Sequence, residues 1–348
     1  MKFYIPLFLL LFSNSFLSKG QGENQSYSAL IARIETIIDD SDFNGVVLLT
    51  EGTSTVFYEA KGYSNFEDSI VMEKGDQFVI GSISKQITAV LVLREYEKGN
   101  LSLNDEIGKY LPLLDQNWSK SVTVHHLLSH THGIVDVTTP LEFDPGSQFQ
   151  YSQLGYELLA RILENITGNS FEELSTQLFA ENGLFNTFHP DNMGYKFLVK
   201  GYEESGNAAL EYVTNSLGNH VAAGAFIANA EDLSKWNHLL YSGGLVGNET
   251  LELMKTRYAT RIHPIFGQIE YGYGLLFHMG EENVQIGALG YAPGFASACY
   301  YYPQADLSLV VLENTARDLD DIKKTFIIHT QLMEAAKSET LTIQNSDL

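Results

Sequence analysis

Ser82 and Lys85 lie three residues apart in the segment GSISKQIT, residues 81–88 of a chain of 348 residues. Side chains at positions i and i+3 share one face of a helix, so this spacing brings the hydroxyl and the amine together. Burial lowers the pKa of a lysine, and the neutral amine can then accept the proton of a serine hydroxyl. The pair therefore predicts a serine nucleophile that is activated by a lysine.

The patterns around this pair place it where a short strand meets a buried helix. Residues 76–81, DQFVIG, are typical of a strand, and residues 82–98 are apolar on nearly every side before Gly99 ends the helix. A helix N-terminus carries partial positive charge, which disfavours an ammonium group and stabilises an oxyanion. Because Ser-x-x-Lys is short enough to arise by chance, this location is the stronger signal.

Strand patterns occupy both ends of the chain, and helical patterns dominate between them. A helix is expected at about 27–40, two strands at 45–63, further strands from about 269 to 314, and a last helix at about 319–336. We therefore expect an α+β fold, with one antiparallel sheet built from both chain ends, flanking helices and an inserted, mostly helical lobe. The sheet lobe would comprise about 27–98 and 230–336, the helical lobe about 99–229, and residues 337–348 a flexible tail.

The N-terminal segment indicates where the protein works. Residues 1–20 contain an apolar run from Phe3 to Phe12 that is too short to span a bilayer and is typical of a secretory signal peptide; an N-terminal anchor is the alternative. We expect an exported protein, periplasmic or extracellular, with no membrane span in the mature chain.

The net charge of −22 would repel phosphate backbones, so no nucleic-acid partner is expected. Cys299, the single cysteine, is expected in the core.

Longer stretches around these residues resemble the serine β-lactamase-related family, which includes class C β-lactamases, D,D-peptidases and esterases. The resemblance is carried by FVIGSISKQITAVLVLREYEKGNLSLNDEIGKYLP (78–112), VTVHHLLSHTHGI (122–134), FQYSQLGYELLARILENITGNSFEEL (149–174), VAAGAFIANAEDLSKWNHLLYSGG (221–244) and YGYGLLF (271–277). It extends from about residue 30 to 332. It implies a β-lactamase/transpeptidase-like fold and catalysis without a metal or an organic cofactor.

The resemblance also implies roles for individual residues. Ser82 matches the acyl-accepting nucleophile of the family and Lys85 matches its partner. Tyr151 matches the tyrosine that acts with the lysine as base and proton relay, and a phenol needs a nearby ammonium to do so near neutral pH. Gln153 stands where the family has an asparagine that binds substrate, so the amide is kept but lies one methylene further out.

The third motif of the family is altered in this chain. Its usual pattern of Lys or His, any residue and Gly is Ala288-Leu289-Gly290 here, before the PGF at 293–295. Gly290 would let substrate approach the strand backbone, and the resemblance implies an oxyanion hole made of the N–H groups of Ser82 and Tyr291. Because the basic residue is missing, we expect no cation for a substrate carboxylate, which favours a neutral ester or amide over β-lactams and D-Ala-D-Ala peptides.

The sequence therefore predicts an exported serine hydrolase that acts on an ester or amide of a small-molecule or peptide substrate through a Ser82 acyl-enzyme, in the manner of an esterase or a peptidase. The alternative is a catalytically impaired member of the family that binds a ligand without turnover, which the altered third motif would favour. Intact Ser82, Lys85 and Tyr151 argue for turnover. The pattern does not address the oligomeric state.

A zinc hydrolase is a further alternative, because histidines occupy positions 125, 126, 130 and 132. His126 and His130, at i and i+4, could share a helix face and a metal ion. No His-Glu-x-x-His arrangement is present, and the same stretch resembles a family segment that binds no metal. We therefore expect His126 and His130 to be hydrogen-bonded structural residues.

Overall fold

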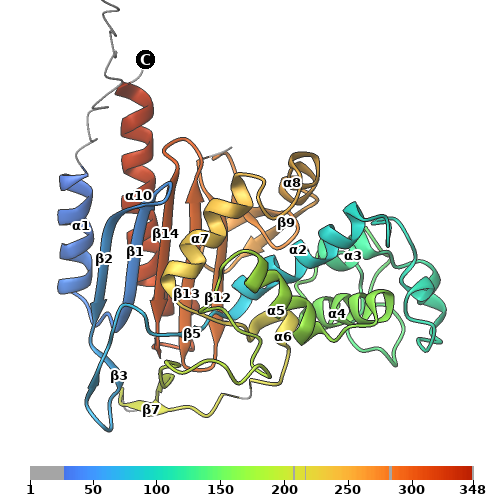
Figure 1. The fold of residues 1–348 in the computed structure, drawn as a ribbon, viewed down its shortest axis with the longest axis horizontal. Coiled ribbons are helices and arrows are strands. Elements are labelled where there is room, and N and C mark those ends of the chain that lie inside the picture. The colour runs from blue at the N-terminus through green and yellow to red at the C-terminus, as the bar shows by residue number, and fades with distance from the viewer. Residues whose placement is uncertain (1–26, 207, 216, 282–283, 347–348) are drawn as a thin grey trace, which may run out of the picture.

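An antiparallel sheet of eight strands forms the centre of the computed structural model, which describes residues 27–346 except 207, 216, 282 and 283 (Figure 1). From edge to edge the strands are β2 (Ser54–Lys61), β1 (Gly45–Glu51), β14 (Leu307–Glu313), β13 (Phe295–Tyr302), β12 (Ile286–Ala292), β11 (Leu276–His278), β10 (Gly267–Tyr271) and β9 (Ala259–His263). β1 pairs with β14, with Val47 opposite Val311, so both ends of the chain build one sheet, as predicted. The predicted signal peptide at 1–20 lies outside the described residues.

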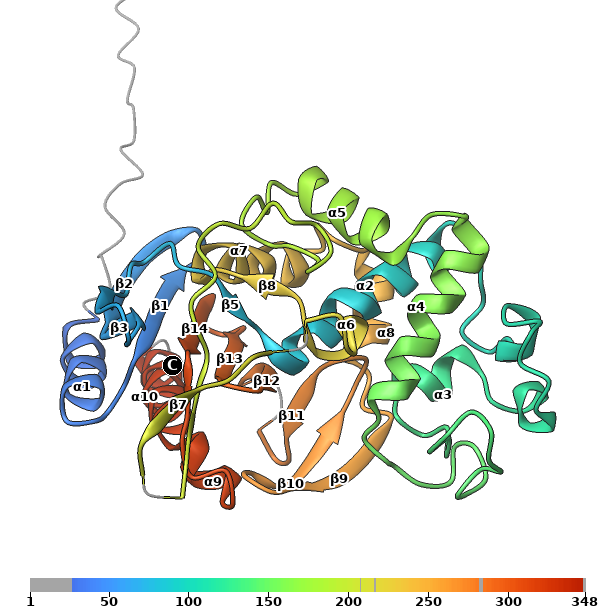
Figure 2. The same cartoon turned by 90° about the horizontal axis from the view of Figure 1, so that it is seen from below.

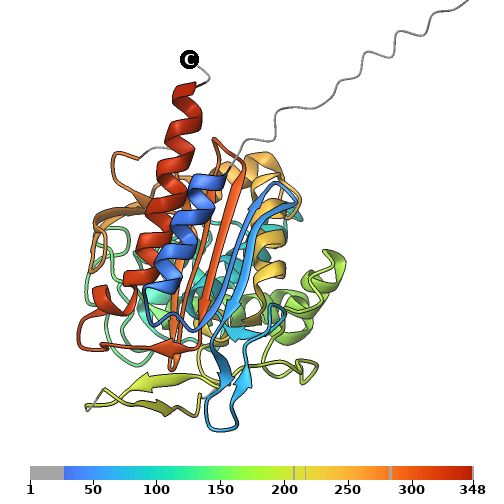
Figure 3. The same cartoon turned by 90° about the vertical axis from the view of Figure 1, so that its left-hand side faces the viewer.

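Helices cover both faces of this sheet. α1 (Ser28–Asp39) and α10 (Ile327–Ser346) lie side by side on one face, as Figure 3 shows, and α9 (Ile322–Thr325) precedes α10. α2 (Ser84–Glu97) and α7 (Ala230–Tyr241) cover the other face, and Asn237 of α7 donates to Ser308 Oγ of β14 at 2.9 Å. Because both faces are covered, β14 is buried along its whole length. Cys299 is a buried core residue, as expected.

The second part of the molecule surrounds the far end of α2 and consists mostly of helices and loops. α2 lies between α4 and the strands of the sheet (Figure 2). The helices of this part are α3 (Val124–Leu128), α4 (Gln153–Thr167), α5 (Phe171–Glu181), α6 (Val221–Gly224) and α8 (Asn248–Lys255). None of the helices within the described ranges is long and apolar enough to cross a bilayer.

The predicted helical lobe at 99–229 also contains strands. β6 (Tyr202–Glu204) pairs with β7 (Leu210–Tyr212) and with β15 (Thr315–Ala316), while β8 (Ile227–Ala228) pairs with β5 (Phe78–Val79). A two-stranded ribbon of β3 (Tyr63–Asn65) and β4 (Ile70–Val71) extends from the sheet. These strands have only two or three residues, which is too short for a pattern of alternation, and β15–β6 and β5–β8 also pair segments that are distant in the sequence.

Two helix ends differ from the sequence-based expectation. The residues Gly81–Ile83 form a 3₁₀ turn and the α-helix begins only at Ser84, so Ser82 lies just before it. The last helix continues to Ser346, well past Ala336, and Thr340 is buried with its hydroxyl donating to the Ala336 carbonyl at 3.0 Å. The stretch after Ala336 contains no Gly or Pro that would end a helix, so the expected tail is helical as far as Ser346.

Candidate active site

The turn that carries Ser82 is held tightly against strand β12. Ser297 donates its hydroxyl to the Ile80 carbonyl at 2.9 Å, which connects the residues before the turn to the sheet. Gly81 has a φ of +54°, and a Cβ atom there would lie only 2.4 Å from the backbone nitrogen of Tyr291. Only glycine permits both this backbone conformation and this close approach. The turn therefore places Ser82 beside the backbone of Tyr291.

Lys85 is fully buried one turn further along and points at Ser82. Its Nζ lies 3.3 Å from Ser82 Oγ, 2.7 Å from the Gln153 amide oxygen and 2.7 Å from the Ala223 carbonyl oxygen. A neutral amine has two N–H groups and one lone pair. The two carbonyl oxygens can accept the two N–H groups, which leaves the lone pair facing the hydroxyl of Ser82.

Burial favours this neutral form of Lys85. Loss of solvent lowers the pKa of the Lys85 ammonium, while the hydroxyl of Tyr151 and the carboxylate of Glu157 act in the opposite direction. The amine also lies 4.6 Å from the centre of the Tyr151 ring. The structure thus brings Ser82, Lys85 and Tyr151 together, although 66 residues separate Lys85 from Tyr151 in the chain.

Helix α4 positions Tyr151 and Gln153. Ser152 caps this helix by accepting a hydrogen bond from the Gly155 N–H, so Tyr151 is the last residue before the cap and Gln153 begins the first turn. The Ser152 N–H donates to Nδ1 of His130, a buried histidine whose neutral form is favoured because burial lowers its pKa. Tyr151 remains partly exposed, at 37%, so its hydroxyl can meet a substrate.

Strand β12 brings the altered third motif to the opposite side of Ser82. A Cβ atom at Gly290 would lie 2.0 Å from the Ile80 carbonyl oxygen, so this strand and the Ser82 turn touch through backbone atoms. The N–H groups of Ser82 and Tyr291, which the resemblance assigns to an oxyanion hole, therefore belong to two segments in direct contact. The Tyr291 hydroxyl donates to Glu203 at 2.8 Å and holds the end of the strand.

A cavity of about 160 Å³ opens over Ser82. Its lining residues are Ser82, Tyr151, Arg261, His263, Pro264, Ile265, Tyr271, Leu276, Ala288, Leu289, Tyr291, Ile322 and Phe326. Ala288, which the resemblance aligns with the basic residue of the family, is one of these lining residues. The expectation of a site without a cation is nevertheless wrong, because Arg261 of β9 lines the same cavity.

The four histidines of the segment 125–132 do not form the helix face that a zinc site would need. α3 ends at Leu128, and His130 lies beyond it with a φ of +59°. Nδ1 of His126 accepts from the Thr123 N–H, and Nε2 of His130 lies 3.2 Å from the Tyr271 hydroxyl. Across the described ranges, no group of three or more His, Cys, Asp or Glu side chains could hold a metal ion.

Sequence reasoning missed three contributors to this site: the Ala223 carbonyl, His130 as a support for Tyr151, and Arg261. A backbone carbonyl leaves no signal in a sequence. His130 was visible only within a histidine cluster that suggested a metal. Arg261 lies in the strand ATRIH, whose two-residue alternation places Arg261 and His263 on one face, but nothing local shows that this face meets Tyr151.

Comparisons with known proteins bear on the family and the fold of this chain. The family model described as Beta-lactamase matches residues 30–331. A penicillin-binding protein of Bacillus subtilis is 24% identical over 82% of this chain and 71% of its own length. A teichoic acid D-alanine hydrolase of Staphylococcus aureus is 24% identical over 70% of this chain and 64% of its own length. In the same fold, the crystal structure of D-amino acid amidase from Ochrobactrum anthropi has a TM-score of 0.79, 20% identity, and coverage of 89% of this chain and 99% of that one.

Proposed function

Because this chain belongs to the Beta-lactamase family of serine hydrolases, we propose that it hydrolyses an ester or amide through an acyl-enzyme on Ser82. The observation that carries the proposal is the environment of Lys85. Two carbonyl oxygens, each 2.7 Å from Nζ, accept its two N–H groups, and the lone pair of the neutral amine faces Ser82 Oγ at 3.3 Å. This arrangement suits a base that takes a proton from the serine.

In the proposed reaction, Ser82 Oγ attacks the carbonyl carbon of the substrate while its proton passes to Lys85. The N–H groups of Ser82 and Tyr291 stabilise the oxyanion of the tetrahedral intermediate. Tyr151, next to Lys85, relays the proton to the leaving alcohol or amine as the ester or amide bond breaks. Water then attacks the acyl-enzyme and gives a proton to Lys85, this proton passes to Ser82 Oγ as its bond to the acyl group breaks, and the acid product leaves. Gln153, through its amide, orients Lys85 and contacts the substrate.

The mass of the intact protein tests this proposal most directly. Incubation with a fluorophosphonate should add one phosphonyl group, and the adduct should be absent from Ser82→Ala but present in Ser54→Ala, a change at an exposed serine of β2. Incubation with a penicillin, in parallel, distinguishes an esterase-like from a peptidase-like pocket. If the folded wild-type protein forms no adduct with either reagent, the impaired, ligand-binding alternative replaces the hydrolase.

We also propose that the protein is exported. The support is the apolar run from Phe3 to Phe12, within a stretch of twenty residues typical of a signal peptide. N-terminal sequencing of the protein recovered outside the cytoplasm of a bacterial host should begin near residue 20. A cytoplasmic protein that retains residue 1 would contradict export.

A further inference from the structure

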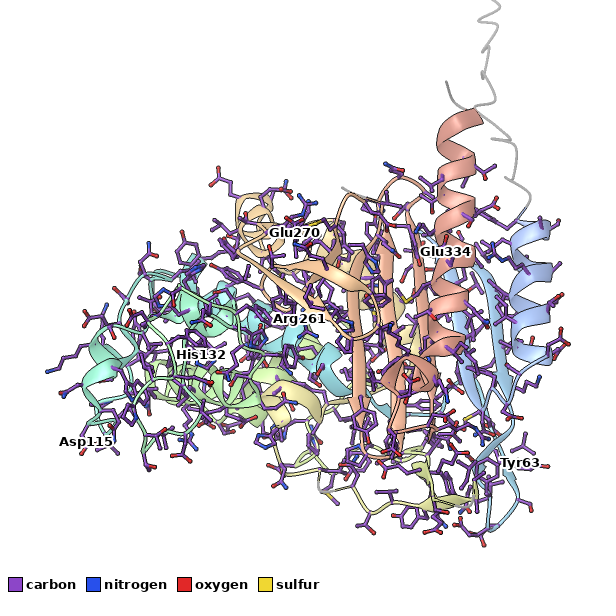
Figure 4. The ribbon with its side chains drawn as sticks, turned by 180° about the vertical axis from the view of Figure 1, so that it is seen from behind. Tyr63, Asp115, His132, Arg261, Glu270 and Glu334 are labelled. Atoms are coloured by element: carbon purple, nitrogen blue, oxygen red, sulfur yellow. The ribbon has the colours of Figure 1, made fainter. Side chains whose placement is uncertain are left out.

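Arg261 is a cation that lines the cavity and has no anionic partner among the residues that the structure describes. It extends from β9 towards the region between the sheet and the helical part, as Figure 4 shows. Its guanidinium carbon lies 5.1 Å from the ring centre of Tyr151 and 5.5 Å from that of Phe149. Its Nε is buried without a hydrogen-bond partner, and no ion pair involves Arg261 among the residues that the structure describes.

A neighbouring arginine has the counter-ion that Arg261 lacks. Arg257, four residues earlier, lies over the Phe277 ring and forms an ion pair with Glu270 at 3.1 Å. The chain contains 43 acidic residues, so carboxylates are abundant, yet none is among the residues that line the cavity. A partly buried guanidinium without a counter-ion is costly, and an anion that enters the cavity would remove that cost.

We propose that Arg261 binds a carboxylate or another anionic group of the substrate whose carbonyl Ser82 attacks. This inference rests on the proposed hydrolase function and specifies its substrate class. The planar guanidinium can donate two parallel hydrogen bonds to a carboxylate, and it remains charged at any working pH. A substrate with an ammonium group in the same place would be repelled. The cation comes from β9, whereas the family pattern places one on β12, at position 288.

Matched esters that differ only in charge test the proposal. One set carries the charge on the acyl part: 4-nitrophenyl hexanoate, mono(4-nitrophenyl) adipate, and the analogue that ends in trimethylammonium. A second set carries it on the alcohol part: phenyl acetate, 3-acetoxybenzoate and (3-acetoxyphenyl)trimethylammonium. In at least one set the anionic ester should have the highest kcat/KM and the cationic ester the lowest, and this order should weaken as salt is added.

Variants then assign the preference to Arg261. Arg261→Gln should reduce the ratio of kcat/KM for the anionic ester to that for the neutral ester by about tenfold or more, as expected for lost hydrogen bonds to a charged group. Arg261→Lys should give an intermediate ratio, because it keeps the positive charge but cannot donate two parallel hydrogen bonds to the carboxylate. Arg257→Gln, the matched control, removes a nearby charge outside the cavity lining and should leave the ratio unchanged.

Two results would overturn the proposal: a wild-type enzyme without an anionic preference in either set, or an unchanged ratio in folded Arg261→Gln. The wild-type comparison needs no variant, so it applies even if Arg261→Gln fails to fold. If no ester is hydrolysed and no fluorophosphonate adduct forms, the hydrolase proposal fails separately. In that case, calorimetric titration of Ser82→Ala with monomethyl adipate and with uncharged methyl hexanoate tests whether Arg261 binds an anion. Monomethyl adipate that does not bind, or that binds no more tightly than methyl hexanoate, would refute the proposal.

Discussion

Replacing Gly290 with alanine should disable the site without removing any functional side chain. The new Cβ would lie 2.0 Å from the Ile80 carbonyl oxygen and 2.5 Å from Ser297 Oγ, whereas Cβ atoms almost never come closer than 3.0 Å to another heavy atom. Strand β12 and the Ser82 turn must therefore separate by about 1 Å. That movement carries the Tyr291 N–H away from the Ser82 N–H.

Two magnitudes follow from this geometry. Overpacking of this kind costs about 1–3 kcal/mol in the free energy of unfolding. Loss of one oxyanion donor slows the chemical step by about 10²–10³-fold. Gly290 has no positive φ, so the effect comes from steric contact and not from backbone strain. We therefore expect Gly290→Ala to be folded at low temperature but acylated at least about a hundredfold more slowly.

The assay is the rate of fluorophosphonate labelling, followed by intact mass at a temperature below the unfolding transition of each variant. Gly287→Ala, on the same strand as Gly290, is the matched control, because its Cβ would lie 2.2 Å from the Cys299 carbonyl oxygen of the neighbouring strand β13, away from Ser82. It should lower Tm but keep the labelling rate. Gly75→Ala has no atom within 4 Å and should change neither. A folded Gly290→Ala that labels at the wild-type rate would refute the oxyanion assignment.

Two further predictions concern pH. Because burial lowers the pKa of Lys85 below its ordinary 10.5, labelling should rise with pH along a limb that ends below that value. Lys85→Arg, which cannot deprotonate, should lack this limb and should be slower by about 10²-fold at the pH where wild-type labelling is fastest. A pH-independent wild-type rate would contradict this. Burial raises the pKa of Glu313 from 4.5 to about 8, so only the folded protein holds this proton between those values. Stability should fall with rising pH across that window, by at most about 1.4 kcal/mol per unit, and Tm scans of Glu313→Gln should show a flatter dependence; an equal slope would exclude this group.

The sequence located the candidate nucleophile and its partner because their relation is local. Ser82 and Lys85 are separated by less than one helical turn, and the apolar residues around them predicted burial. The strand patterns at both ends of the chain likewise predicted one sheet built from both ends. Even so, the boundary between the 3₁₀ turn and α2 was not predictable, since it depends on the contact between Gly81 and the Tyr291 backbone.

The histidines illustrate the limit of local spacing. His126 and His130 fit an i, i+4 pair, but the helix ends at Leu128 and turns His130 towards Ser152 and Tyr271. Where this helix ends depends on residues more than twenty positions away. Ser152, the N-cap of α4, and Tyr271 of β10 are the hydrogen-bond partners of His130. A pattern of four residues contains no information about such partners.

By itself, then, the sequence determined which chemical groups are present and which of them are neighbours along a helix, because spacing within one element fixes their faces. It also determined the loss of a basic residue at 288. Only the tertiary structure decided what surrounds those groups: the Ala223 carbonyl that accepts from Lys85 across 138 residues, and the Arg261 guanidinium beside Tyr151. The physical reason is that charge, desolvation and hydrogen bonding depend on distance in space, and long-range packing sets that distance.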